Sequence, residues 1–136
     1  MPRLSSHFAL KDPRFQSLVY PLITVTTLTD AAATLTAAQV QGGLILCPAS
    51  TGRTLTLPTA ALLSDAIQGG LVGTAFEFTI RNTGAGTVTV AAGTGGTTSG
   101  TMTVATTASK RFLVLFTNVT VGSEAFTIYS LGSSTF

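Results

Sequence analysis

The sequence contains few charged residues and few of the side chains that enzymes commonly use. Lys, Arg, Asp and Glu make up 9% of its 136 residues, with one histidine, one cysteine and no tryptophan. An ordinary soluble domain has about 25% charged residues. A single cysteine excludes an intrachain disulfide and a zinc site built from several cysteines. Acid–base catalysis would therefore depend on five carboxylates and His7, which lies in a segment we expect to be separate from the packed body.

The scarce titratable residues form no pattern that is typical of catalysis or metal binding. Cys47 ends an apolar run and precedes Pro48, which suits a buried and inert thiol. Whole predicted elements separate the four carboxylates after residue 20, which are Asp30, Asp65, Glu77 and Glu124. No loop has the alternating acidic residues of a calcium site. We therefore predict no catalytic residue, no metal ion and no cofactor, and we expect that the protein is not an enzyme.

Long apolar runs are also missing, although 45% of the residues are hydrophobic. A membrane-spanning helix needs about 20 consecutive apolar residues, and the strongest run here covers residues 112–116. Residues 1–22 have no continuous apolar segment of the kind found in secretory signals and are interrupted by Pro13. We expect no membrane partner, and we expect the protein to fold in the compartment where it is made.

A low content of charge favours assembly. Soluble surfaces usually carry about 25–35% charged residues, so an apolar-rich chain with so few is poorly protected against association. We therefore expect a homo-oligomer. The alternative is a monomer whose surface is made polar by threonine, the commonest residue in the sequence.

The net charge of +2 lies in the first twenty residues, where three cations outnumber Asp12. This excess is too small for a nucleic-acid partner, which requires a clustered basic face. The segment has aromatic residues but no strand or helix periodicity. We interpret residues 1–20 as an extended docking arm, with a solvated tail as the alternative. The residues expected to dock are Arg3, Phe8, Lys11, Arg14, Phe15 and Tyr20.

From residue 21 onward, short threonine-rich runs alternate apolar and polar residues. In residues 74–81, for example, Phe76, Phe78 and Ile80 share one face, as in a half-buried strand. Further strands are predicted at residues 22–28, 43–47, 54–57, 87–92, 101–106, 111–119 and 124–131. Short strands joined by glycine-rich turns predict an all-β fold, an antiparallel β-sandwich or jelly-roll-like domain over residues 21–136.

One short helix is predicted after Pro58, with Thr59 as its N-cap and Gly69 as its stop. The residues expected on one face of this helix are Ala61, Leu62, Ala66 and Ile67. The pattern from Thr36 to Gln39 also fits a capping box, which indicates a short helix or a turn.

The run from Phe112 to Phe116 is apolar at every position. It indicates either a central strand covered on both sides or a strand with one face in the core and one against a neighbouring subunit. The low charge favours the second arrangement. We take Phe112, Val114 and Phe116 as the candidate oligomer interface.

The glycine- and threonine-rich tract of residues 86–104 resembles a nucleotide loop only in its glycines. A phosphate loop requires lysine and a hydroxyl residue after its last glycine, and Thr101 and Met102 occupy those positions here. Alternating valine and threonine on both sides argue against disorder. We predict two strands joined by a glycine-rich connection over residues 93–100.

Three stretches in order carry a family resemblance: TLTLPTAALLSDAI, GTAFEFTIRNTGAGTVTVAAGTGG and RFLVLFTNVTVGSEAFTIYSLG. Over about residues 28–132 the chain resembles a β-sandwich domain of virion structural proteins of tailed phages and large algal viruses. The resemblance implies a capsid decoration or fibre-head role, commonly as a trimer, and no enzymatic activity.

The short segment before the β domain favours one of these roles, because a tail fibre normally has a long shaft before its head. We expect a decoration or cement protein on the capsid surface of a virion, assembled in the host cytoplasm. Its expected partners are the major capsid protein or other virion proteins. The alternative is a fibre-head or receptor-binding module that recognises a host glycan.

Overall fold

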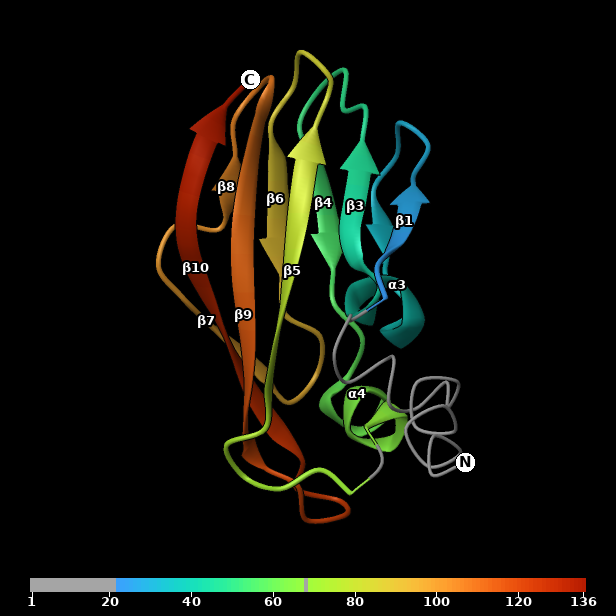
Figure 1. Cartoon of the computed structure of the whole chain (residues 1–136), viewed down its shortest axis with the longest axis vertical. Helices are drawn as coiled ribbons and strands as arrows, with labels where there is room; N and C mark the ends of the chain where they lie inside the picture. Colours follow the sequence, from blue (N-terminus) through green and yellow to red (C-terminus); the bar gives the residue numbers. More distant parts are fainter. Residues whose placement is uncertain (1–21, 68) are drawn as a thin grey trace, which may run out of the picture.

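The computed structural model describes residues 22–67 and 69–136 of the chain. These residues form two β-sheets arranged in two layers, with two short helices toward the lower end of the view in Figure 1. The predicted arm of residues 1–20 lies outside the described residues. The all-β class expected from the sequence is confirmed.

The larger sheet has six strands in the order β1-β3-β5-β9-β10-β7. All of them run in one direction except β9, which is antiparallel to both of its neighbours. Their bounds are β1 (Thr24–Thr27), β3 (Gly43–Cys47), β5 (Ala75–Asn82), β7 (Gly96–Ser99), β9 (Ala108–Asn118) and β10 (Ala125–Thr135).

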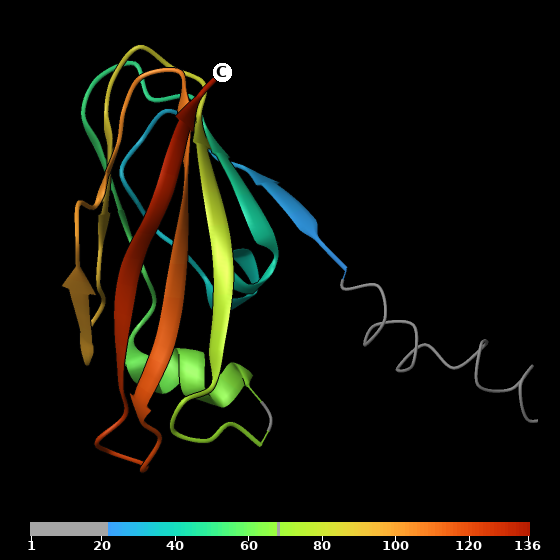
Figure 2. The same cartoon turned by 60° about the vertical axis from the view of Figure 1, so that its left-hand side comes forward.

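The smaller sheet has four strands in the order β2-β4-β6-β8. Strands β2, β4 and β6 are parallel, and β8 is antiparallel to β6. Their bounds are β2 (Ala33–Thr34), β4 (Arg53–Thr56), β6 (Val88–Ala91) and β8 (Thr103–Val104). Figure 2 shows the two layers side by side.

The predicted antiparallel arrangement is wrong, because both sheets are mixed. From β1 to β9 the chain passes alternately through the six-stranded and the four-stranded sheet. Up to β6, each strand that follows a passage through the other sheet runs in the same direction as the preceding strand of its own sheet, whereas β8 and β9 reverse that direction. Parallel pairs therefore result, whereas directly connected neighbours such as β9 and β10 are antiparallel.

Apolar side chains at alternate strand positions fill the space between the layers. Val88 and Val90 of β6 are buried, as are Phe78 and Ile80 of β5, so the predicted alternation is confirmed there. The Phe78 ring stacks on that of Phe112, with 5.3 Å between the centroids. Burying a side chain of this size contributes about 1.5–3 kcal/mol.

The capping box near Thr36 does begin a helix, α3 (Ala37–Gln41). The Thr36 hydroxyl accepts a hydrogen bond from the Gln39 amide at 3.2 Å, and the Gln39 side-chain oxygen accepts one from the Thr36 amide at 2.9 Å. The described residues therefore contain two helices where one was predicted.

The second helix, α4 (Ala60–Ala66), begins after Thr59 as predicted, and the Thr59 hydroxyl accepts a hydrogen bond from the Leu62 amide. The predicted face is wrong, because the helix buries Ala60 and Leu63 while Leu62 is 58% exposed. The Ala60 amide donates to the Thr94 carbonyl at 2.8 Å, which turns this end of the helix toward the loop after β6.

The glycine- and threonine-rich tract contains three strands. Strands β6 and β8 pair as antiparallel neighbours, as predicted, but the connection between them includes β7, which pairs with β10 in the other sheet. A Cβ at Gly96 would overlap the Phe126 ring, so this crossing requires glycine. The Thr97 and Thr127 hydroxyls lie 2.9 Å apart across the pair.

We predict that Gly93→Ala destabilises the fold by about 1–3 kcal/mol, because overpacking forces the backbone to shift. A Cβ at Gly93 would overlap the carbonyl oxygens of Leu57 and Pro58. Urea unfolding measures the change. Gly52→Ala is the control, since a Cβ there meets nothing within 4 Å. Equal unfolding midpoints for the two variants would contradict the prediction.

Candidate functional site

A carboxylate, a hydroxyl and a guanidinium meet where three loop or strand ends come together. Asp30 follows β1, Ser50 lies between β3 and β4, and Arg53 begins β4. The Arg53 Nε donates to Asp30 Oδ1 at 2.8 Å, and the Ser50 amide donates to the same oxygen at 3.0 Å. The Ser50 hydroxyl donates to Asp30 Oδ2. These bonds join the β1–β2 and β3–β4 connections.

The hydrogen bonds to Asp30 determine the charge of this cluster. Those from Arg53 and Ser50 hold the pKa of the Asp30 carboxyl well below its usual range, and the Asp30 carboxylate raises the pKa of Arg53. A carboxylate held in this way is a weak general base at neutral pH. Nearby, burial raises the pKa of the Cys47 thiol, which disfavours the reactive thiolate. The cluster is suited to holding loops together.

We predict that Asp30→Asn lowers the melting temperature at neutral pH. Because the pKa of Asp30 is lower in the folded chain, its contribution to stability is present at neutral pH. That contribution is lost as pH falls below the unfolded value of about 3.9. The difference in melting temperature between the wild type and Asp30→Asn should therefore narrow as the pH is lowered from about 5 to about 2.

Melting curves of Asp65→Asn provide the control for this titration, because Asp65 makes no hydrogen bond or ion pair with any described side chain. A gap between wild type and Asp30→Asn that stays constant with pH would contradict the proposed linkage.

Asn82 at the end of β5 is a structural residue that the sequence patterns missed. Its side chain is fully buried. Its amide nitrogen donates to the carbonyls of Gly86 at 2.7 Å and Ala105 at 3.0 Å, and its oxygen accepts from the Gly84 amide at 3.0 Å. One side chain thereby connects the β5–β6 turn with the segment after β8. The turn-forming sequence NTGAG was the available signal, but it did not indicate the distant partner.

We predict that Asn82→Ala destabilises the protein by about 1–3 kcal/mol or more, since it leaves buried backbone groups without their partner. Chemical denaturation measures this loss. Asn118→Ala is the matched control, because the Asn118 oxygen accepts one local bond from the exposed Thr120 amide. The assignment fails if both alanine variants lose the same stability.

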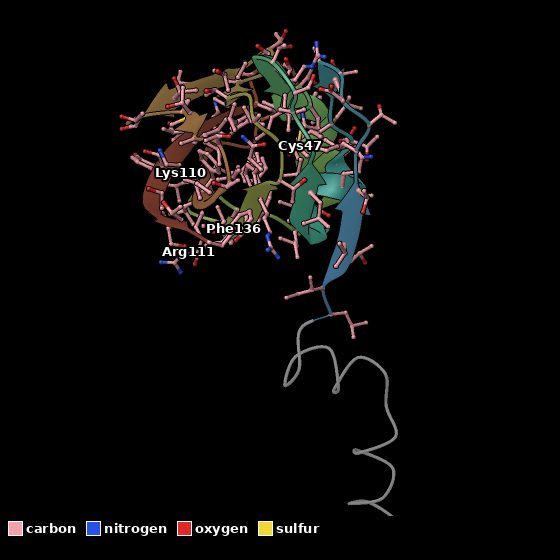
Figure 3. The ribbon with its side chains drawn as sticks, turned by 90° about the horizontal axis from the view of Figure 1, so that it is seen from above. Cys47, Lys110, Arg111 and Phe136 are labelled. Atoms are coloured by element: carbon pink, nitrogen blue, oxygen red, sulfur yellow. The ribbon has the colours of Figure 1, made fainter. Side chains whose placement is uncertain are left out.

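Two neighbouring cations of β9 point in opposite directions (Figure 3). Lys110 points between the layers, is 8% exposed, and donates from Nζ to the Thr101 carbonyl at 2.8 Å. Arg111 points outward, and its Nη1 lies 3.5 Å from Glu77 Oε1. Each cation therefore already has a partner within the fold.

The described residues form a cleft of ≈ 600 Å³. It lies between α3, α4 and the ends of β2 and β4, and no acidic, basic, histidine or cysteine side chain lines it. Five of its lining residues are threonines, namely Thr34, Thr36, Thr56, Thr59 and Thr94. Hydroxyls over an apolar floor can bind a neutral ligand by hydrogen bonds.

The structure places the candidate oligomer interface inside the chain. Phe112, Val114 and Phe116 are at most 1% exposed and belong to the core. The expectation that they contact another subunit is therefore wrong. The apolar side chains that β9 turns away from the core are the half-buried Leu113 and Leu115.

The residues predicted to dock lie outside the part of the chain that the structure describes: Arg3, Phe8, Lys11, Arg14, Phe15 and Tyr20. Within that part, no three His, Cys, Asp or Glu side chains gather as metal ligands would. Neither α3 nor α4, the helices of residues 22–67 and 69–136, is long and apolar enough to cross a membrane.

Comparison with known proteins finds no matching family model, curated protein or solved structure. The resemblance to virion structural proteins therefore stays an expectation from the sequence.

Proposed function

We propose that this chain is a virion structural protein, a capsid decoration or cement protein. In this proposal residues 1–20 bind the capsid lattice, through the major capsid protein or another virion protein, and the body self-associates as a trimer on the capsid surface. In this proposal the two facing layers form a sandwich or jelly-roll domain.

The position of β1 is the main support for this proposal. Residues 1–20 carry the whole net charge of +2, and they connect to the body at β1, an edge strand of the six-stranded sheet. Leu22 and Ile23, just before this strand, are 80% and 69% exposed. A docking segment needs this kind of accessible attachment, since a buried junction would hold it against the body.

The charged groups of the body also support a role in assembly. Arg53 is paired with Asp30, Arg111 with Glu77, and Lys110 with a backbone carbonyl. These contacts hold loops and strands together. Most of the charged groups in the described part of the chain thus have a partner within it.

Removal of residues 1–20 tests the docking role. We predict that the shortened protein still folds, because its buried core lies wholly within residues 35–128. We also predict that it no longer binds particles stripped of this chain. Co-sedimentation with the stripped particles measures binding. Full decoration by the truncated protein, or absence of the chain from purified particles, would contradict the proposal.

A full-length variant separates charge from length. Changing Arg3, Lys11 and Arg14 to glutamate should weaken co-sedimentation, because it reverses the charge of the arm. Thr54→Glu, which places a glutamate at an exposed position of the four-stranded sheet, is the control and should bind as the wild type does.

The second candidate is a fibre-head or receptor-binding module for a host glycan. The threonine-lined cleft favours it, because sugar hydroxyls can pair with threonine hydroxyls. A glycan array with the full chain distinguishes the two functions: glycan binding that Thr56→Val and Thr94→Val abolish would favour the receptor role.

A further inference from the structure

The outer faces of the two sheets have different chemistry. In the four-stranded sheet, the residues that alternate with the buried ones are almost all threonines: Thr34, Thr54, Thr56, Thr89 and Thr103, together with Ala91. Threonine has a high strand preference and a hydroxyl that water can solvate. A sheet face of this composition is compatible with contact with water.

The outer face of the six-stranded sheet carries more large apolar side chains. Its outward positions include Val25, Leu44, Leu46, Leu113, Leu115 and Tyr129, and the polar residues Glu77, Thr79 and Arg81 of β5 lie between them. Strand register places them on one side, since Val25 is opposite Leu44 and Leu113 is opposite Tyr129. No described element lies over this face, which is turned toward the viewer in Figure 1. Val25 is 53% exposed and Tyr129 37%.

The acidic and basic side chains on this face nearly balance one another. Glu77 and Arg111 form an ion pair at 3.5 Å, and the Arg81 guanidinium lies 4.0 Å from the centroid of the Phe136 ring. A strongly charged partner would find little complementary charge here. A second copy of the same chain would meet a face as nearly neutral as its own, without the like-charge repulsion that opposes association.

The size of the face is sufficient for a stable contact. Strands about 4.8 Å apart, with eight residues of about 3.4 Å each in β5, give the six-stranded sheet roughly 650 Å² of flat area. A standard interface removes about 800 Å² from each partner.

We propose that copies of this chain associate through the outer face of the six-stranded sheet, with Leu44, Leu113 and Leu115 at the contact. The four-stranded sheet then turns its threonine face to water. This inference rests on the self-association in the proposed function but changes its symmetry, because a contact between like faces joins two copies and gives a dimer in place of the trimer. It does not depend on binding to a capsid.

The test compares two lysines placed at equivalent half-buried outward positions. Leu115→Lys puts an ammonium in the proposed contact, where its directly paired neighbours Ala75 and Thr127 are uncharged. Thr89→Lys puts the same group on the other sheet. By analytical ultracentrifugation of the full chain, Leu115→Lys should raise the dissociation constant about 100-fold or more, and Thr89→Lys should leave it unchanged.

A second variant keeps the test valid if Leu115→Lys fails to fold. Leu44→Thr with Leu115→Thr copies the residue type of the opposite sheet and retains strand preference, so it should stay folded by circular dichroism and dissociate. A wild type that sediments as one chain, or a Leu115→Lys variant that keeps the wild-type mass, would overturn the proposal.

The full chain with Phe8→Ser and Phe15→Ser examines the other possible occupant of the face, residues 1–20 themselves. Wild-type mass for this variant supports contact between the sheets, whereas its dissociation would assign the contact to those residues and overturn the proposal. The mass of the isolated chain is measured without viral particles. A loss of self-association is therefore detected separately from a loss of capsid binding.

Discussion

Strand β9 is the element on which the six-stranded sheet depends. It lies between β5 and β10, which run in the same direction, and it is antiparallel to both. On its inner side Phe112 stacks on Phe78 of β5, and the Phe116 ring centroid lies 6.3 Å from that of Phe126 of β10. These contacts link β9 to β5, which comes earlier in the sequence, and to its hairpin partner β10. Without β9 the sheet would divide into two smaller pieces with open edges.

Local patterns in the sequence were sufficient to identify most strands and both helix starts. The alternation around Phe78 and the N-caps Thr36 and Thr59 act over a few residues, so they are visible in sequence. The direction of strand pairing was not visible, because a half-buried strand has the same alternation in a parallel or an antiparallel sheet. Here the path of the chain through two sheets determines that direction.

The features that were missed depend on contacts between distant segments. Strand β7 has no apolar alternation and pairs with the distant β10, where Gly96 lies opposite Phe126 and leaves room for its ring. Asn82 binds a carbonyl more than twenty residues away. Residues 112–116 are apolar on both faces of their strand, so the sequence did not show which side chains point inward. The structure places the phenylalanines in the core. The predicted docking residues lie outside the described chain, so they remain a prediction.

The shared direction of β1 and β10 also determines where the chain leaves the body. Because β1 begins the described fold and β10 ends it, the start of β1 and the C-terminus lie toward opposite ends of the strands (Figure 1). A peptide or reporter fused after Phe136 would therefore project from the end of the strands opposite to the start of β1. The fold separates the two ends of the described chain, which makes the C-terminus a suitable position for cargo that must not obstruct the start of β1.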